Sequence, residues 1–257
     1  MRAPRALPGG RLDAQRWQPY SDQSPWGLPW RPTAAIGRAH DIEGQTGHTL
    51  AMNRVDDIRE KALKDLQDYE VLMLNGHFDF GNGYHGQVYL HSHQLFRHPA
   101  RIWRLAQDLL DVLPASVIDA TEVVAGPVTG GALLAHTVAG LLDGRRDIAR
   151  PATLFAPFSV DAATGHTLSR FYRDQVRGRK VLVVDDVRNT GQTFARCAAL
   201  VREGGGTVIA TAEIYDRMEA VIEIGVPNFA LAEYRAPENY PAATCPLCRS
   251  GVPVTSF

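Results

Sequence analysis

Apolar and polar residues alternate from residue 118 onward in a way that predicts strands followed by helices. The expected strands are short apolar runs, and the expected helices carry apolar residues at three- and four-residue spacing. We predict strands at 122–125, 151–158, 180–184, 207–215 and 229–234, and helices at 132–142 and 194–202. Strands that alternate with helices are joined by right-handed crossovers into an open parallel sheet. The sequence therefore predicts an α/β fold whose core spans about residues 118–235.

The residues before this core give a weaker pattern. Helical spacing predicts one helix over 55–66, and a second helix at 100–112 is expected to end before Pro114. The glycine-rich stretch 71–93 between them predicts short strands and turns.

Residues 1–51 show neither helical nor strand periodicity and are rich in proline and glycine. We expect a disordered extension, followed by a folded domain at 52–257. Two other interpretations stay open: a mitochondrial-type presequence, and translated upstream sequence with Met52 as the true start. Three tryptophans are the reason to consider that the segment docks onto the folded domain: Trp17, Trp26 and Trp30.

Composition narrows the class of protein. The chain has 257 residues, 45% hydrophobic and 21% charged, so it can bury a sizeable core. Its formal net charge of −1 gives no bulk attraction to nucleic acid or to an anionic membrane, and neither is expected as a partner. No apolar run is long enough to span a bilayer. Three cysteines argue against a secreted disulfide framework, so we expect a cytoplasmic protein.

Candidate chemistry lies in the segment Val181-Leu-Val-Val-Asp-Asp-Val-Arg-Asn-Thr-Gly-Gln-Thr193. A buried strand runs into two acids, and burying both without compensation would be costly, so Asp185 and Asp186 are expected to face a cleft. There they can accept hydrogen bonds from sugar hydroxyls or hold a hydrated Mg²⁺. The following loop offers N–H groups, hydroxyls and a helix N-terminus, which attract phosphate. The alternative is an ordinary strand–loop–helix with a capped start.

This segment resembles the motif with which type I phosphoribosyltransferases bind 5-phosphoribosyl 1-diphosphate (PRPP). The resemblance implies that Asp185 and Asp186 contact the ribose 2′- and 3′-hydroxyls and hold Mg²⁺ indirectly. It implies that the 5′-phosphate is wrapped by Val187, Arg188, Asn189, Thr190, Gly191, Gln192 and Thr193. The family's pyrophosphate loop corresponds to Gly126, Pro127, Val128, Thr129, Gly130 and Gly131. An ordinary tight turn is the alternative for that second segment.

Other segments resemble orotate phosphoribosyltransferases. Gly76-His-Phe78, Asn82-Gly-Tyr-His85 and Val88-Tyr-Leu90 resemble their small N-terminal hood, expected here at about 69–98. The resemblance makes Arg217 the partner of the orotate carboxylate and adds Phe78 and Thr190 to the base site. A guanidinium matches a carboxylate bidentately. The alternative for Arg217 is a surface ion pair with Asp216 or Glu219.

The C-terminal Cys245-Pro-Leu-Cys248 resembles the tail of a bacterial and archaeal orotate subfamily. One such cysteine pair is half a zinc site, and we find no second cysteine or histidine pair with ligand spacing. We therefore expect a structural turn. A disulfide, and a site shared across a dimer, stay open.

The chain also departs from the family pattern, because no lysine occurs between Lys64 and Lys180. Gly130 stands where many relatives carry a lysine. The mobile catalytic loop is expected at 159–173, with His166, Arg170 and Arg173 as candidates to face pyrophosphate. His166 is either a proton donor or a solvated loop histidine.

The resemblance thus implies a type I phosphoribosyltransferase fold, with Mg²⁺ as cofactor and a homodimer as the assembly. The implied reaction transfers a phosphoribosyl group from PRPP to orotate, giving orotidine 5′-monophosphate and pyrophosphate for pyrimidine biosynthesis. Two alternatives stay open. One is an enzyme for a purine or another heterocyclic base, and the other is a non-catalytic PRPP-sensing regulator.

Overall fold

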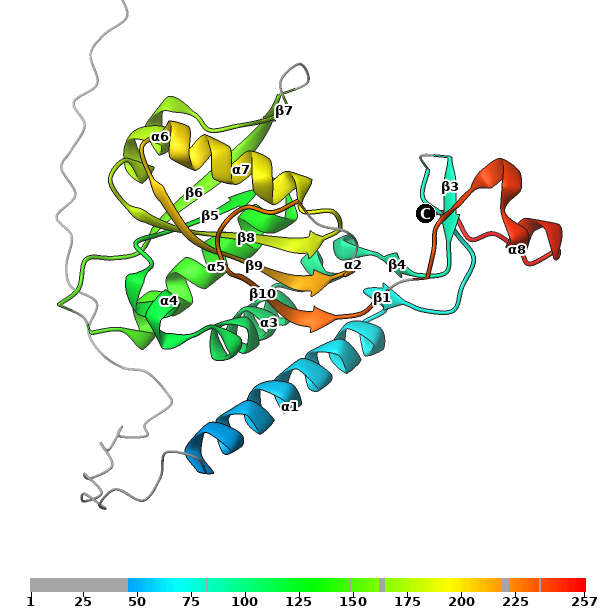
Figure 1. Ribbon diagram of the computed structural model, residues 1–257, viewed down its shortest axis with the longest axis horizontal. Helices are drawn as coiled ribbons and strands as arrows, with labels where there is room; N and C mark the ends of the chain where they lie inside the picture. Colours follow the sequence, from blue (N-terminus) through cyan, green and yellow to red (C-terminus); the bar gives the residue numbers. More distant parts are fainter. Residues whose placement is uncertain (1–45, 82, 148, 162–164, 219–221, 236) are drawn as a thin grey trace, which may run out of the picture. The chain divides into compact units, whose positions relative to one another are not determined.

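The structure is a computed structural model that describes residues 46–81, 83–147, 149–161, 165–218, 222–235 and 237–257, with side chains from residue 54 onward (Figure 1). The first helix, α1 (Thr46–Asp68), begins before the boundary predicted at Met52. The rest of the predicted extension, with its three tryptophans, lies outside the described residues.

A sheet of six strands forms the centre, in the order β10-β9-β8-β5-β6-β7. The first five in that order run parallel, and β7 pairs antiparallel with β6 at the edge. The strands are β5 (Val123–Pro127), β6 (Leu154–Asp161), β7 (Gly165–Thr167), β8 (Lys180–Arg188), β9 (Thr207–Asp216) and β10 (Asn228–Glu233). The predicted α/β fold with an open parallel sheet is confirmed.

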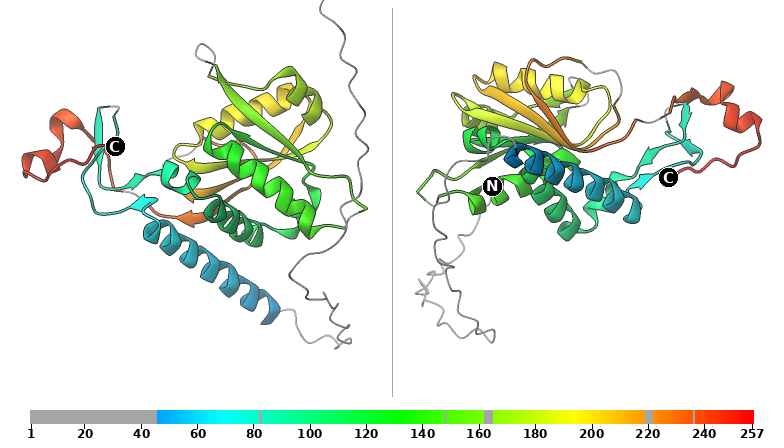
Figure 2. Two further views of the ribbon diagram at one scale, coloured as in Figure 1. Left: turned by 180° about the vertical axis from the view of Figure 1, so that it is seen from behind. Right: turned by 60° about the horizontal axis from the view of Figure 1, so that its bottom comes forward.

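Helices cover both faces of this sheet (Figure 1; Figure 2, right). On one face lie α1, α3 (Pro99–Val112), α4 (Ala115–Ala120) and α5 (Gly130–Arg145), and on the other lie α6 (Arg170–Val176) and α7 (Gln192–Glu203). Alternate side chains of β8 pack against the helices on opposite faces of the sheet. Leu182 and Val184 pack with α3 and α5, and Val181 and Val183 pack with α7. This alternation explains why the strand is apolar at consecutive positions.

The predicted hood is present but includes more of the chain than 69–98. One pair of strands joins β1 (Leu72–Met73) to β4 (Tyr89–Leu90), which leads into α2 (Ser92–Phe96). A second sheet has the order β11-β3-β2, and its strands are β2 (Phe78–Asp79), β3 (Tyr84–Gly86) and β11 (Tyr240–Pro241). The C-terminal segment therefore belongs to the hood, as its position beside β3 in Figure 1 illustrates. It continues through a 3₁₀ turn (Ala242–Thr244) and α8 (Pro246–Arg249).

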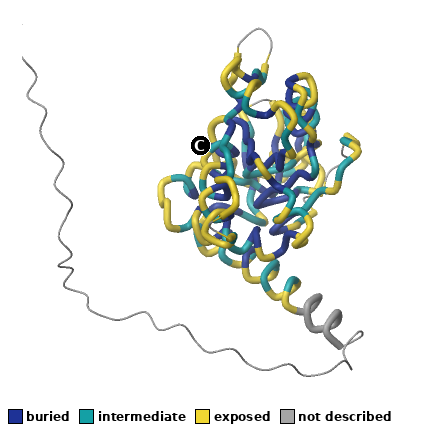
Figure 3. The backbone as a smooth tube through the Cα atoms, turned by 90° about the vertical axis from the view of Figure 1, so that its left-hand side faces the viewer, coloured by how far each residue is buried: buried dark blue, intermediate teal, exposed yellow. Residues whose placement is uncertain are grey.

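The segment expected as a mobile loop at 159–173 is largely regular. β6 extends to Asp161, its residues pair with β7, and α6 begins at Arg170. Residues 162–164 at the tip lie outside the described part. Figure 3 shows the buried positions gathered in the interior of the sheet and helix layers. Among the described residues, no helix is long and apolar enough to cross a membrane.

Candidate active site

The two predicted acids stand near the end of β8, where the apolar part of the strand is finished. Asp185 is buried, with 7% of its surface exposed, and Asp186 is half-buried. Burial, and then the neighbouring charge of Asp186, raise the pKa of Asp185 well above its ordinary value. The Asp186 N–H donates a hydrogen bond to Asp185 Oδ1 at 2.9 Å. Asp185 therefore holds a proton more readily than an exposed aspartate does.

A hollow of about 270 Å³ follows the acids and is lined by Asp185 and by every residue from Val187 to Phe194. Gly191 has φ of +76°, a left-handed conformation that glycine adopts without strain, and α7 begins at the next residue. The start of that helix presents backbone N–H groups and the positive end of its dipole. The hollow therefore combines an acid at one end with a site suited to phosphate.

The glycine turn predicted as the pyrophosphate loop lies directly against the acids. A Cβ on Gly130 would stand 2.7 Å from Asp186 Cγ, and one on Gly131 would stand 2.7 Å from Asp185 Oδ1. A Cβ on Gly126 would stand 2.1 Å from the Gly131 carbonyl oxygen. These contacts are too close for any side chain, so the glycines permit the turn to approach the acids. The Val128–Thr129 peptide bond in this turn is cis.

Arg188, one of the residues that line the hollow, is paired with two buried acids of β9. The Arg188 guanidinium forms an ion pair with Asp216, and its Nε lies 3.5 Å from Glu213 Oε1. Glu213 is fully buried and accepts a 2.7 Å hydrogen bond from Asn228 Nδ2. Its Oε2 is buried without a hydrogen-bond partner among the described residues. Burial raises the pKa of Glu213 to about 8.

Glu213→Gln is expected to stabilise the protein at alkaline pH. The pKa of Glu213 rises from an ordinary 4.5 to about 8 on folding, so burying the ionised form costs increasingly more as pH rises between these values. Glutamine removes that cost, and the variant should gain on the order of 3 kcal/mol over the wild type between pH 5 and pH 8. Thermal melting of both proteins across this range measures the difference. A constant difference in melting temperature would show that Glu213 does not titrate in this range.

A second hollow of about 350 Å³ adjoins the first and shares Val187 and Asn189 with it. Its other lining residues come from the hood and from the segments after β9 and β10: Phe80, Tyr89, Leu90, Arg217 and Asn239. The Arg217 guanidinium lies 5.8 Å from the Phe80 ring centroid and donates to Asn239 Oδ1 at 3.4 Å. A planar ring and a guanidinium thus meet in one hollow.

Of the three residues that the sequence predicted for the base site, only Arg217 lines the second hollow. Phe78 is buried and faces another hollow, where its ring lies 6.1 Å from that of Phe257, and Phe80 takes the place beside Arg217. Thr190 lines the first hollow, which Asp185 also lines. Asp216 pairs with Arg188, and Glu219, the other ion-pair partner considered for Arg217, lies outside the described residues. Phe80 and Asn239 were missed because no motif marks them.

Two of the candidates on the expected mobile loop stand apart from the acids. His166 is half-buried on β7, and burial and the charge of Arg196 lower its pKa. Arg170 is exposed at the start of α6. Among the described residues, neither forms a hydrogen bond or an ion pair with Asp185 or Asp186.

Comparison with known proteins agrees with this geometry. Residues 91–226 match the phosphoribosyl transferase domain family. An orotate phosphoribosyltransferase of Caldanaerobacter subterraneus is 31% identical over 76% of this chain and 95% of its own length. One from Maricaulis maris is 32% identical over 70% of this chain and 87% of its own length.

The fold agrees as well. The crystal structure of orotate phosphoribosyltransferase from Aeropyrum pernix superposes with a TM-score of 0.51 at 23% identity, covering 67% of this chain and 93% of that one. The acids at the end of β8, the first hollow and the glycine turn all lie within residues 91–226, which match the family. The chain belongs to the type I phosphoribosyltransferase family, and its curated relatives include orotate phosphoribosyltransferases.

Proposed function

We propose that the protein transfers the phosphoribosyl group of PRPP to orotate, forming orotidine 5′-monophosphate and pyrophosphate for pyrimidine biosynthesis. The observation that carries the proposal is the pair of adjoining hollows, one suited to a phosphorylated sugar and the other holding Arg217 beside Phe80. A flat anion with a carboxylate fits the second hollow, because a guanidinium can donate two parallel hydrogen bonds to a carboxylate. The names of the relatives support the same base.

The first hollow would hold the ribose 5-phosphate. Thr190 and Thr193 hydroxyls and the N–H groups at the start of α7 bind the phosphate, while Asp185 and Asp186 accept hydrogen bonds from the ribose hydroxyls. The glycine turn at 126–131 would bind pyrophosphate through backbone N–H groups, since its glycines leave no side chain between it and the acids.

The acids also fit Mg²⁺, which prefers carboxylate oxygens and retains bound water. Asp185 and Asp186 would hold the ion through water or through the ribose, because both are adjacent on β8 and Asp185 lines the hollow proposed for the sugar. When bound, Mg²⁺ neutralises negative charge that develops on pyrophosphate.

Cleavage of the bond to pyrophosphate builds positive charge on the anomeric carbon, as in glycoside hydrolysis. The half-buried Asp186, next to Asp185 in the strand, would stabilise that charge. The hairpin of β6 and β7 is the segment proposed to close over pyrophosphate, bringing Arg170 to its charge and excluding water. The lowered pKa of His166 makes it mostly neutral at pH 7, so its role as proton donor depends on a rise of its pKa beside pyrophosphate. We also propose that the protein forms a homodimer and acts in the cytoplasm.

A base panel assayed with PRPP and Mg²⁺ tests the function. We expect orotate to be consumed, and orotidine 5′-monophosphate and pyrophosphate to form in equal amounts, measured by absorbance and chromatography. Uracil should react poorly, because it lacks the carboxylate that Arg217 would bind. Turnover of purines alone would contradict the choice of base. Binding of PRPP by calorimetry with no turnover of any base would instead identify a PRPP-sensing regulator.

A further inference from the structure

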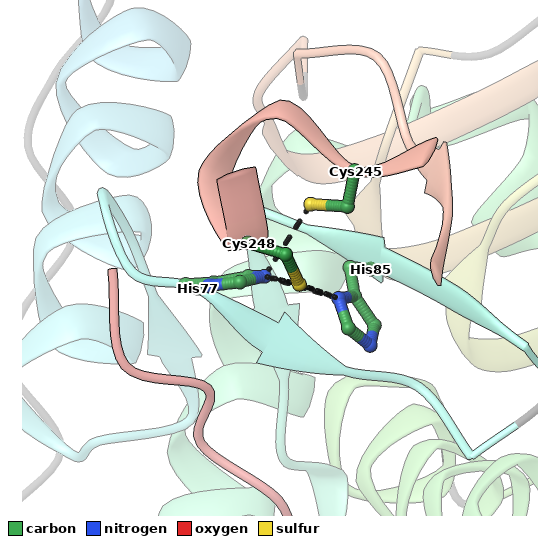
Figure 4. Close-up of side chains that lie close together, drawn as sticks. All are labelled: His77, His85, Cys245 and Cys248. Atoms are coloured by element: carbon green, nitrogen blue, oxygen red, sulfur yellow. Dashed lines mark hydrogen bonds between the residues drawn. The ribbon is translucent and has the colours of Figure 1, made fainter. Parts of the chain in front are cut away.

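Four side chains that can bind metal converge in the hood, away from the acids of the active site (Figure 4). His77 precedes β2 and His85 lies on β3. Cys245 directly precedes α8 and Cys248 lies within it, far from the histidines in the sequence. One ligand atom from each lies within 4.8 Å of the other three. The sequence interpretation that no pair completes the two cysteines is therefore wrong.

Four of the six distances between these atoms lie close to the edges of a tetrahedral zinc site. A zinc ion with bonds of about 2.0–2.1 Å to nitrogen and about 2.3 Å to sulfur separates its ligand atoms by about 3.3–3.8 Å. His77 Nε2 lies 3.0 Å from His85 Nδ1 and 3.4 Å from Cys245 Sγ. Cys248 Sγ lies 3.7 Å from His77 Nε2 and 3.3 Å from His85 Nδ1. Small shifts would place all four atoms around one ion.

A hydrogen-bond partner orients His77 as a ligand, and a carboxylate lies near the remaining ring nitrogen of His85. His77 Nδ1 lies 2.9 Å from the Val252 carbonyl oxygen, which can only accept a hydrogen bond. Nδ1 of His77 therefore carries the proton, and Nε2 presents its lone pair to the cluster. His85 Nε2 lies 4.0 Å from an Asp79 carboxylate oxygen, on the side away from the cysteines. Metal-binding histidines usually have a carbonyl or carboxylate partner of this kind.

Burial and charge favour the same occupant. His77, His85 and Cys245 expose 3%, 8% and 0% of their surfaces, so the cluster is closed on most sides. Two thiolates and two neutral imidazoles carry a charge of −2, which Zn²⁺ balances. We propose that His77, His85, Cys245 and Cys248 form a structural zinc site. Four protein ligands leave no open position, which distinguishes this site from a catalytic one.

The site would fix the C-terminal segment to the hood. Tyr240 pairs with His85 across β11 and β3, so one ligand is itself a contact between the two segments. Gly86 follows His85 and leaves room for the hollow, because a Cβ there would stand 2.4 Å from the Phe80 ring and 2.6 Å from Asn239 Oδ1. Both of those residues line the hollow around Arg217. Zinc would therefore hold the wall of the base site in place, a consequence that rests on the proposed function.

Zinc content of the full chain tests the proposal. The protein is purified in a reducing buffer without chelator or a metal-affinity step, and its metals are measured by plasma mass spectrometry. We expect about one zinc ion per chain. The Cys245→Ser/Cys248→Ser variant should retain less than about a tenth of that amount, because two ligands are lost. Cys197→Ala is the matched control, since this third cysteine is buried on α7 outside the cluster.

Cobalt titration of the metal-free wild type gives a readout that needs no variant. Co²⁺ bound by two thiolates in a tetrahedral site shows thiolate charge-transfer absorption and strong d–d bands, and Zn²⁺ should displace it. Absence of zinc from the purified protein together with no such spectrum would overturn the proposal. A mass showing a Cys245–Cys248 disulfide after reducing purification would overturn it as well.

Kinetic measurements distinguish failure of the zinc proposal from failure of the proposed reaction with orotate. If zinc is bound and orotate is the base, removing zinc should raise KM for orotate by about tenfold and lower the melting temperature by about 10 °C. Zinc bound in full by a protein that does not use orotate would leave the metal site standing and refute the reaction. Orotate turnover by a protein that binds no zinc would do the reverse.

Discussion

Replacing both Asp185 and Asp186 by asparagine is expected to lower kcat/KM for PRPP by about a thousandfold. Asparagine keeps the shape of each side chain but removes the charge that would face the sugar and Mg²⁺. Asp186 should account for most of the loss, because it is half-buried and has the more exposed carboxylate. Asp185 already favours its protonated form, since burial and Asp186 raise its pKa. Steady-state kinetics of the two single variants and the double variant measure this division.

The fold should survive these substitutions. A carboxyl whose pKa is raised by folding destabilises the protein as pH rises, so Asp185→Asn should melt no lower than the wild type at pH 8. Asp119→Asn, at an exposed aspartate of α4, is the control for charge alone. Full turnover by the double variant would disprove the role of the acids in sugar binding.

Much of the sheet could be predicted because its strands are short apolar runs between turn residues. The limits of β8 could not. The prediction ended the strand at residue 184, before the acids, but the structure continues it to Arg188. Asp185 and Arg188 still pair with β9, opposite Glu213 and Asp216. The ion pair between Arg188 and Asp216 compensates charge there, and a single-sequence pattern carries no sign of that contact.

The hood shows where sequence reasoning failed and why. Strand pairs of two or three residues have no periodicity to reveal which face is buried, so Phe78 rather than Phe80 was assigned to the base site. The histidine pair was missed for a related reason. His77 and His85 are eight residues apart, a spacing unlike that of known zinc motifs, and antiparallel pairing of β2 with β3 brings them together. Local motifs such as the acids followed by Thr190-Gly-Gln-Thr193 needed no such information.

The proposed base site combines residues from three separate parts of the chain, so its specificity would depend on how firmly these parts are held together. Phe80 and Tyr89 come from the hood, Arg217 follows β9, and Asn239 precedes β11. The Arg217 N–H donates to the Arg188 carbonyl oxygen at 3.0 Å, which anchors its backbone to the end of β8. Arg217 is thus fixed to the same strand end as the acids, while the opposite wall belongs to the hood.

Arg217→Ala is accordingly expected to raise KM for orotate by about a hundredfold and to leave KM for PRPP unchanged. The size follows from losing a charge-assisted pair of hydrogen bonds, each contributing about 1.5 kcal/mol. The KM of Arg217→Lys for orotate should lie between those of Arg217→Ala and the wild type, because lysine keeps the positive charge but lacks the planar guanidinium. Arg104→Ala, at an exposed arginine of α3, is the matched control and should change neither constant.

Competition by uracil decides whether the carboxylate is what Arg217 recognises. Uracil has the same ring as orotate but no carboxylate, so its weak inhibition constant should be the same for the wild type and Arg217→Ala. Orotate and uracil should then bind the variant with similar affinity, since the difference between them lies in the contact that was removed. If orotate and uracil lost affinity equally in Arg217→Ala, Arg217 would instead maintain the shape of the hollow through its contacts with Phe80 and Asn239. If affinity for orotate and for PRPP fell equally, the substitution would have disturbed the whole site, and this result would contradict recognition of the base by Arg217.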